Sequence, residues 1–205
     1  MSEKKIGIMG GTFNPVHNGH LILAENAFHQ YHLDKVYFMP AGIPPHKQNN
    51  HITAGEIRCN MVKMAIANNP AFDLLDIEVA SNETSYTYRT LEQLKNIFPD
   101  TEIYFIMGAD SLSDFAYWRN PQRISELCRL LVAVRDDLNQ VKLREIADQL
   151  YSDFHTEVEF LSTPNVSISS HDIRNRVWKQ ESIRYLVPDK IREYIIKNHL
   201  YMYEE

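Results

Sequence analysis

The sequence has little of what builds disulfide-rich or membrane-spanning proteins. Its 205 residues include only two cysteines, Cys59 and Cys128, which are too few for a disulfide framework and too widely spaced for a zinc or redox motif. No apolar run approaches the length of a membrane span, and the amino terminus leads into an expected strand without the apolar core of a signal sequence. We therefore expect a cytoplasmic protein in which both cysteines are buried or free thiols.

Positive charge is also scarce. The chain has 21 Lys and Arg residues against 27 Asp and Glu residues, which gives a formal net charge of −6. A nucleic-acid backbone demands a basic face, and a membrane surface demands a polybasic block, so neither is an expected partner. An anionic small molecule would have to be bound locally, by helix N-termini and a few chosen His, Lys and Arg side chains.

The most informative segment is Gly-Gly-Thr-Phe-Asn-Pro-Val-His-Asn-Gly-His at residues 10–20, called the cradle below. It follows a short apolar run and precedes an amphipathic stretch, which is the layout of a strand, a glycine loop and a helix. Gly10 and Gly11 let the backbone approach an anion, the helix start offers unpaired N–H groups, and the imidazoles of His17 and His20 lie beside them. The cradle predicts phosphoryl or nucleotidyl transfer.

Three other interpretations of the cradle are weaker. Two glycines after a strand are often only a tight turn, but Gly19 removes a side chain between the imidazoles, where a polyphosphate needs room. A zinc site could use His17 and His20, yet the H-E-x-x-H pattern is missing and neither cysteine is near in sequence, so no metal ligands are expected from the protein. The G-x-G-x-x-G fingerprint is absent, which disfavours a redox dinucleotide.

Apolar periodicity predicts alternating strands and helices along the whole chain. Strands are expected at residues 4–9, 36–39, 72–79, 102–107, 130–134 and 157–161. Helices are expected at residues 21–31, 53–65, 87–98, 111–115, 141–150, 172–179 and 188–196, the second opening on a capping box of Thr53 and Glu56. This alternation predicts one α/β domain over residues 1–205, with a Rossmann-like parallel sheet, helices on both faces, C-terminal helices and ligands at the carboxyl ends of the strands.

Two later segments have the side chains of an anion site. Lys47, in a loop rich in proline, can present a point charge to a triphosphate or be a solvated loop lysine. After Ile168, the hydroxyls of Ser169 and Ser170 precede a helix with Arg174 one turn further on. This is either a second anion site at a helix start or an ordinary serine cap beside a surface arginine.

Another segment follows the fourth expected strand and therefore lies on the ligand edge of the sheet. Gly108 is followed two residues later by Asp110, which can accept a ribose hydroxyl, cap the next short helix, or do both. Tyr117 and Trp118 come at the end of that helix. An indole face can stack on a pyridine ring, although packing in the core is the commoner fate of such aromatics.

The cradle resembles the signature of the H-x-G-H nucleotidyltransferases, and later segments are similar to those of nicotinate-nucleotide adenylyltransferases. These segments follow in family order: Pro44-Pro45-His46-Lys47, Ser85-Tyr86-Thr87-Tyr88, Gly108-Ala109-Asp110-Ser111-Leu112 with Trp118, and Ile168-Ser169-Ser170-His171-Asp172-Ile173-Arg174. The resemblance implies a nucleotidyltransferase fold. It also implies transfer of the adenylyl group of ATP to nicotinate mononucleotide in NAD biosynthesis, with Mg²⁺ as cofactor, giving nicotinate adenine dinucleotide and pyrophosphate.

The resemblance also implies roles for single residues. His17 and His20 are the implied catalytic residues and hold oxygens of the ATP α-phosphate. Thr87, Tyr117 and Trp118 are implied to bind nicotinate mononucleotide. The implied ATP-binding residues are Gly10, Gly11, Thr12, Phe13, Lys47, Gly108, Asp110, Ile168, Ser169, Ser170 and Arg174.

This chain departs from the family pattern at three positions, and other functions remain as alternatives. Asn14 and Arg89 each stand where the family usually has Asp, and His171 stands where it usually has Thr.

Pantetheine-phosphate adenylyltransferases and cytidylyltransferases share the cradle but should lack the 85–88 segment and Trp118. The presence of both histidines argues against a non-catalytic ATP-binding sensor module. The acidic pI argues against a fragment of an aminoacyl-tRNA synthetase, which would have to bind tRNA. The sequence leaves open a homo-oligomer and the choice between nicotinate and nicotinamide mononucleotides.

Overall fold

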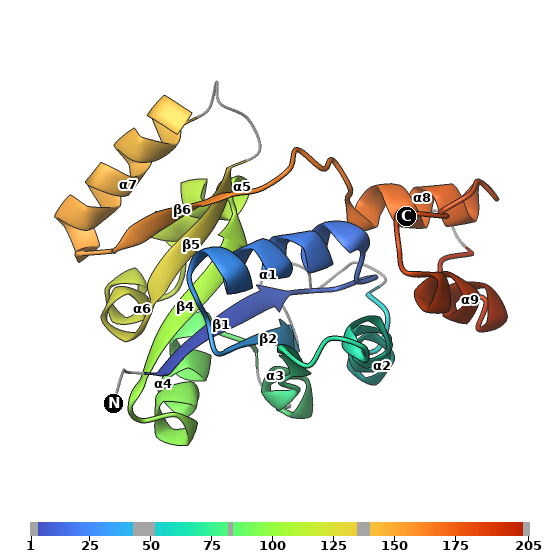
Figure 1. The fold of residues 1–205 in the computed structure, drawn as a ribbon, viewed down its shortest axis with the longest axis horizontal. Coiled ribbons are helices and arrows are strands. Elements are labelled where there is room, and N and C mark those ends of the chain that lie inside the picture. Colours follow the sequence, from blue (N-terminus) through green and yellow to red (C-terminus); the bar gives the residue numbers. More distant parts are fainter. Residues whose placement is uncertain (1–3, 43–51, 82–83, 135–139, 203–205) are drawn as a thin grey trace.

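A parallel sheet forms the centre of the structure, a computed structural model that describes residues 4–42, 52–81, 84–134 and 140–202 (Figure 1). Its strands are β1 (Lys4–Gly11), β2 (Lys35–Pro40), β3 (Phe72–Leu74), β4 (Thr101–Gly108), β5 (Arg129–Val134) and β6 (Val158–Ser162). Their order is β3-β2-β1-β4-β5-β6 and each neighbouring pair is parallel. The expected Rossmann-like sheet is confirmed, and its order reverses between β1 and β4, where such folds bind ligands.

Both faces of the sheet are buried by helices. Along β4, Ile103 and Phe105 belong to one apolar cluster, whereas Tyr104 and Ile106 belong to the other, because successive side chains of a strand point to opposite faces. One cluster receives side chains from α1 (Asn18–Gln30), α2 (Gly55–Ile66), α8 (Ser170–Trp178) and α9 (Asp189–Lys197). The other receives them from α4 (Thr87–Ile97), α5 (Ala109–Ser113), α6 (Pro121–Leu127) and α7 (Gln140–Phe154).

The third strand is shorter than the apolar pattern predicts. Instead of running to residue 79, β3 ends at Leu74, and residues 77–80 form the short helix α3 (Ile77–Ala80). The turn into α3 brings Val79 against α2, where its Cγ1 lies 2.5 Å from the position that a Cβ on Gly55 would take. It also buries the carboxylate of Glu78, which accepts a hydrogen bond from Thr90 Oγ1 at 2.8 Å. These contacts with distant residues override the local preference for a strand.

Four helix starts also differ from expectation by two or more residues. Helix α1 begins at Asn18 instead of residue 21. The capping box of Thr53 and Glu56 is wrong: α2 begins after Ala54, which makes no side-chain cap, and the carbonyl of Thr53 accepts from Arg58 Nε at 2.8 Å. Helix α5 begins after Gly108, so Asp110 lies in its first turn and is not its cap, and a 3₁₀ turn, η1 (Phe115–Tyr117), follows separately. Helix α8 begins two residues early, at Ser170.

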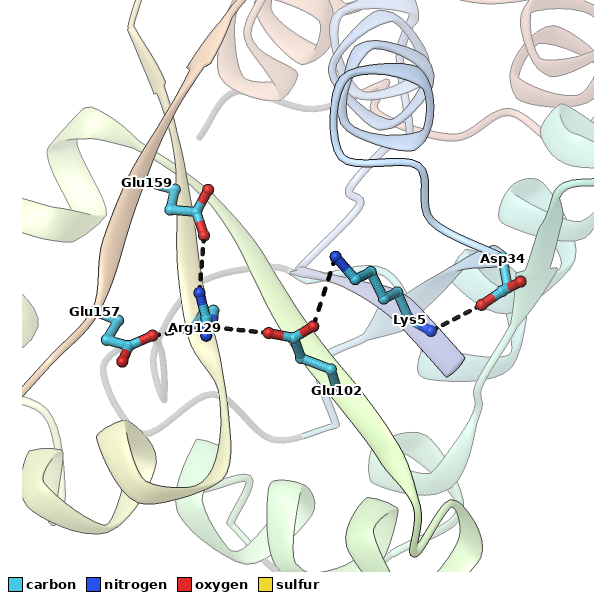
Figure 2. A network of polar contacts seen from close by, with 6 residues as sticks. All are labelled: Lys5, Asp34, Glu102, Arg129, Glu157 and Glu159. Atoms are coloured by element: carbon cyan, nitrogen blue, oxygen red, sulfur yellow. Dashed lines mark hydrogen bonds and ion pairs between the residues drawn. The ribbon is translucent and has the colours of Figure 1, made fainter. Parts of the chain in front are cut away.

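A network of charged side chains links four strands near their amino ends (Figure 2). The guanidinium of Arg129 on β5 lies 2.8 Å from Glu102 on β4, 2.9 Å from Glu157 before β6 and 3.3 Å from Glu159 on β6. Lys5 of β1 extends the network, because its Nζ lies 3.8 Å from Glu102. These charges therefore lie at the edge of the sheet opposite to the carboxyl ends of the strands.

The two cysteines agree with the expectation of buried or free thiols. Cys59 and Cys128 are both free and buried, and burial raises the pKa of the Cys128 thiol to about 12. In the described ranges, no helix is both long enough and apolar enough to cross a lipid bilayer.

Candidate active site

The cradle joins the carboxyl end of β1 to the start of α1, and the residues between them, 12–16, are called the cradle loop. Gly10 and Gly11, at the end of β1, lie directly against aromatic rings. A Cβ on Gly10 would lie 2.8 Å from the ring of Phe105, and a Cβ on Gly11 would lie 3.1 Å from the ring of Phe13. The backbone of the cradle therefore packs directly on these rings, in a way that no other residue type permits without a shift.

Phe13 holds the cradle loop in an unusual conformation. Its φ of 48° lies in the left-handed region, which costs a bulky residue on the order of 1–3 kcal/mol. The ring is buried and packs on Phe38, and its centroid lies 4.9 Å from that of His20 in an edge-on contact. Packing of the ring thus offsets the backbone strain and supports one of the two histidines.

The two histidines form one unit at the start of α1. His17 is the N-cap and is buried, and its ring stacks on that of His20 with centroids 3.6 Å apart. The backbone N–H of His17 donates to Nδ1 of His20 at 3.2 Å. Because Nδ1 accepts, the proton of a neutral His20 ring is assigned to Nε2, which is the nitrogen that can donate to an anion. The first turn of the helix adds its own N–H groups and partial positive charge.

The structure brings the start of α8 to the cradle, as a joint anion site requires (Figure 1). At Gly19, a Cβ would lie 3.0 Å from His17 Nδ1 and 3.6 Å from the Cβ of Ile168, so the missing side chain permits both approaches. Ser170 Oγ donates to the carbonyl of Pro15 at 2.8 Å, and Arg174 donates to the carbonyl of Asn14 at 2.7 Å. Two helix starts therefore converge on one place.

These contacts give the serines and the arginine of α8 a structural role as well. Ser169 is the N-cap of α8, with its Oγ accepting from the N–H of Asp172 at 3.0 Å, which is the alternative that the sequence left open. Ser170 and Arg174 bind the backbone of the cradle loop. Phosphate binding by these three residues stays a prediction. Lys47 lies outside the described residues.

Arg58 was missed by the sequence analysis and is the most buried cation near the cradle, at 2% exposure. It donates to the carbonyls of Thr12 at 2.7 Å, Ala41 at 2.7 Å and Gly42 at 3.4 Å, besides that of Thr53. Burial lowers its pKa. A signal was present, because Arg58 falls on the same face of its predicted helix as apolar residues three and four positions further on.

The carboxyl end of β4 forms the second wall of the site. Met9 of β1 is paired with Ile106 of β4, which sets the end of the cradle strand beside Gly108. Asp110 follows in the exposed first turn of α5, as a ribose-binding carboxylate would require. The carboxyl ends of β1 and β4, where the strand order reverses, are the expected ligand position in this fold.

Trp118 and the cradle both contact the ring of Phe105 on β4. Its indole packs edge-on against Phe105 with centroids 6.1 Å apart, and Phe105 is the ring that also packs on Gly10. Trp118 is half-buried, whereas the neighbouring Tyr117 is 86% exposed. Trp118 therefore packs on the core and is still partly accessible.

Thr87, the remaining predicted substrate residue, is the first residue of α4. The segment before it is tied to the end of β2, because Ser85 Oγ accepts from the N–H of Gly42 at 3.1 Å. The carbonyl of Glu78 leaves no room for a side chain on Gly42. Burial raises the pKa of the Glu78 carboxyl, and hydrogen bonds from Thr90, Ser85 and Gly42 oppose that rise.

The three departures from the family pattern have defined surroundings. Asn14 is buried, and its Oδ1 accepts from Tyr201 Oη at 3.0 Å. Arg89 is exposed and donates to Tyr88 Oη at 3.0 Å. His171 is exposed, with Nε2 lying 2.9 Å from Asn175 Nδ2. Of the three, only Asn14 lies within the cradle.

The side chains around the cradle are mainly hydrogen-bond donors. Within the described part of the chain, no group of three or more His, Cys, Asp and Glu side chains is arranged to hold a metal ion. Imidazoles, hydroxyls, a guanidinium and helix N–H groups suit an anion that brings its own cation better than a metal cage built by the protein.

The comparisons with known proteins agree with this geometry. Residues 8–176 match the cytidylyltransferase-like family model. A protein of Lachnoclostridium phytofermentans named "Probable nicotinate-nucleotide adenylyltransferase" is 40% identical over 199 residues, covering 97% of this chain and all of that one. A protein of the same name from Desulfitobacterium hafniense is 41% identical, covering 97% of this chain and 96% of its own. The chain belongs to the nicotinate-nucleotide adenylyltransferase family.

Solved structures show that this adenylyltransferase has the fold of other proteins with related names. The nicotinic acid mononucleotide adenylyltransferase of Plasmodium falciparum, solved with NaAD, matches with a TM-score of 0.79 at 22% identity over 98% of both chains. A structure from Vibrio parahaemolyticus matches with a TM-score of 0.68 at 24% identity, covering 98% of this chain and 97% of that one. At these identities the likeness concerns the fold alone.

Proposed function

We propose that this chain transfers the adenylyl group of ATP to nicotinate mononucleotide, forming nicotinate adenine dinucleotide and pyrophosphate for NAD biosynthesis. The observation that carries the proposal is the stacked pair of His17 and His20 at a helix start, where the strand order reverses between β1 and β4. About 40% identity over nearly the whole chain to proteins named for this reaction supports the choice of substrates. We also propose that residues 1–205 form a single domain, which is supported by the one sheet that contains all strands of the described residues.

The reaction needs no nucleophile from the protein. An ionised phosphate oxygen of nicotinate mononucleotide attacks the α-phosphorus of ATP, and the bond to the β-phosphate oxygen breaks as pyrophosphate leaves with the electron pair. Catalysis then depends on holding the reactants in line and on donors placed where negative charge grows. His20 donates through Nε2, and His17 and the first turn of α1 complete the set around the α-phosphate.

The remaining predicted residues divide between the two substrates. The start of α8, with Ser169, Ser170 and Arg174, binds the β- and γ-phosphates together with Lys47, because a guanidinium has five N–H donors and can bind a phosphate besides a carbonyl. Magnesium bound to the ATP phosphates supplies positive charge there. Gly10–Phe13, Gly108, Asp110 and Ile168 hold the adenosine and phosphate backbone, and Thr87, Tyr117 and Trp118 hold the nicotinate end.

The direct test is an assay of purified protein with ATP, Mg²⁺ and one acceptor at a time. Pyrophosphate and the dinucleotide should form with nicotinate mononucleotide, and the rate with nicotinamide mononucleotide measures selection for the ring carboxylate. His17→Ala and His20→Ala should each lower kcat by about 10²–10³ with a smaller change in ATP affinity, since charge on the α-phosphate grows in the transition state.

His29→Ala is the matched control for the histidine variants, because His29 is an exposed histidine of the same helix that pairs with Glu25. It should keep the wild-type kcat. Near-normal kcat in both cradle variants would contradict the assigned roles. Pyrophosphate release with phosphopantetheine, and none with either pyridine mononucleotide, would contradict the proposed substrate.

A further inference from the structure

A buried hydrogen bond joins the carboxyl-terminal segment to the cradle. Tyr201, which follows α9, donates from Oη to Oδ1 of Asn14 at 3.0 Å. Tyr201 is 1% exposed and Asn14 is 5% exposed, so water does not compete for this bond. A hydroxyl and an amide oxygen buried together lose free energy if either loses its partner.

Two arginines also bind the backbone of the cradle loop, close to Asn14. Arg58 donates to the carbonyl of Thr12 and Arg174 to the carbonyl of Asn14, each at 2.7 Å. Because a trans peptide is planar, the N–H that follows a carbonyl points the opposite way. The N–H of Phe13 therefore points away from Arg58. Arg58 thus fixes which way the N–H of Phe13 faces, whereas Arg174 fixes the carbonyl that precedes Pro15, a residue without an N–H.

We propose that Tyr201 is a positioning residue for adenylyl transfer, acting through the side chain of Asn14 on the cradle loop. This inference rests on the proposed function. The loop carries Phe13, whose ring supports His20, and leads directly into His17. Loss of the Tyr201 hydroxyl would let the loop relax and move the imidazoles from the positions they need in the transition state.

The expected defect is in turnover more than in binding. A displacement of about 1 Å at reacting groups can cost on the order of 10²-fold in rate, because the reactants no longer meet in line. Substrate binding is spread over two helix starts and the β4 edge, most of which do not touch Tyr201. Loss of this hydrogen bond should therefore lower kcat while leaving the KM for each substrate nearly unchanged.

The chain offers a matched control in Tyr31. Its Oη donates to the carbonyl of Phe160 at 3.0 Å, the same distance as in the Tyr201 bond, but at the other end of α1. Tyr31→Phe and Tyr201→Phe each delete one hydroxyl and, with it, the hydrogen bond described above. A merely structural role for Tyr201 predicts the same behaviour in both variants.

The experiment compares kcat, both KM values and the melting temperature of wild type, Tyr201→Phe and Tyr31→Phe. Tyr201→Phe should lower kcat about tenfold, in line with one lost buried hydrogen bond, with each KM changed less than about threefold. Tyr31→Phe should keep the wild-type kcat while its melting temperature falls. Asn14→Asp, which keeps an acceptor, should retain most of the wild-type kcat.

Variants at Asn14 keep the test decisive if Tyr201→Phe does not fold. Asn14→Leu removes the acceptor and should lower kcat as Tyr201→Phe does, and the double variant should be no worse than either single one. An unchanged kcat in Tyr201→Phe, or additive losses in the double variant, would overturn the inference while leaving the proposed function intact. Wild-type protein that turns over neither pyridine mononucleotide would overturn both.

Discussion

Single buried polar residues govern much of the behaviour expected of this adenylyltransferase. Glu78 is 8% exposed, and burial raises the pKa of its carboxyl above the ordinary value of 4.5. Its hydrogen bonds from Thr90, Ser85 and Gly42 join α3, α4 and the end of β2. The charged form is therefore disfavoured in the folded protein relative to the unfolded chain.

Glu78→Gln should change the pH dependence of stability. Since the folded pKa is raised, the folded protein retains a proton that the unfolded chain has already lost, so Glu78 stabilises more at low pH. The unfolding free energy of wild type relative to Glu78→Gln should be larger at pH 5 than at pH 7.5 in urea titrations. Glu145→Gln, an exposed change on α7, serves as control. An equal difference at both pH values would contradict the prediction.

At the scale of elements, the sequence predicted the helices, strands and loops whose structure depends on contacts between residues close in sequence. The cradle, the first strand and the helix after it could be recognised because their glycines, histidines and apolar spacing are contiguous. Glu78 and Tyr201 could not, because their partners, a hydroxyl and an amide, are brought near only in the folded chain. Arg58 could be suspected only from its place on an apolar helix face, and its carbonyl partners could not be predicted. The overlong third strand has the same origin, since its end is set by packing on α2.

Ser169→Ala tests the double role of the α8 start. Loss of the cap to the Asp172 N–H should lower stability by about 1 kcal/mol and raise the KM for ATP, because the frayed turn presents its N–H groups poorly. Ser125→Ala is the matched control: its hydroxyl bonds Pro121 on α6. It should lower the melting temperature without changing that KM. The same KM change in both variants would show that the α8 cap has no part in ATP binding.

At the scale of the whole molecule, the two ends of the sheet have separate tasks. The carboxyl ends of β1 and β4 hold the cradle and Asp110, whereas the amino ends hold the network around Arg129 (Figure 2). Three carboxylates surround this one guanidinium, so its removal leaves like charges facing one another across β4, β5 and β6. The network is partly exposed, and salt should therefore screen it.

Arg129→Met should lower the unfolding free energy by about 1–2 kcal/mol at low salt, and by less in 1 M NaCl, where the repulsion between the carboxylates is screened. Its kcat with both substrates should equal that of wild type. Urea titrations at the two salt concentrations and a steady-state assay measure both outcomes. A loss of kcat in the folded variant would contradict the separation of the two ends.

The hydrogen bond between Tyr201 and Asn14 also has a consequence for the order in which the protein is made. Asn14 leaves the ribosome long before Tyr201, yet the two are buried against each other. A nascent chain can pair β1 with β2 long before the carboxyl-terminal segment has been translated. The cradle loop therefore lacks this hydrogen bond until Tyr201 has been translated and has folded against Asn14. Full activity is expected only after that step.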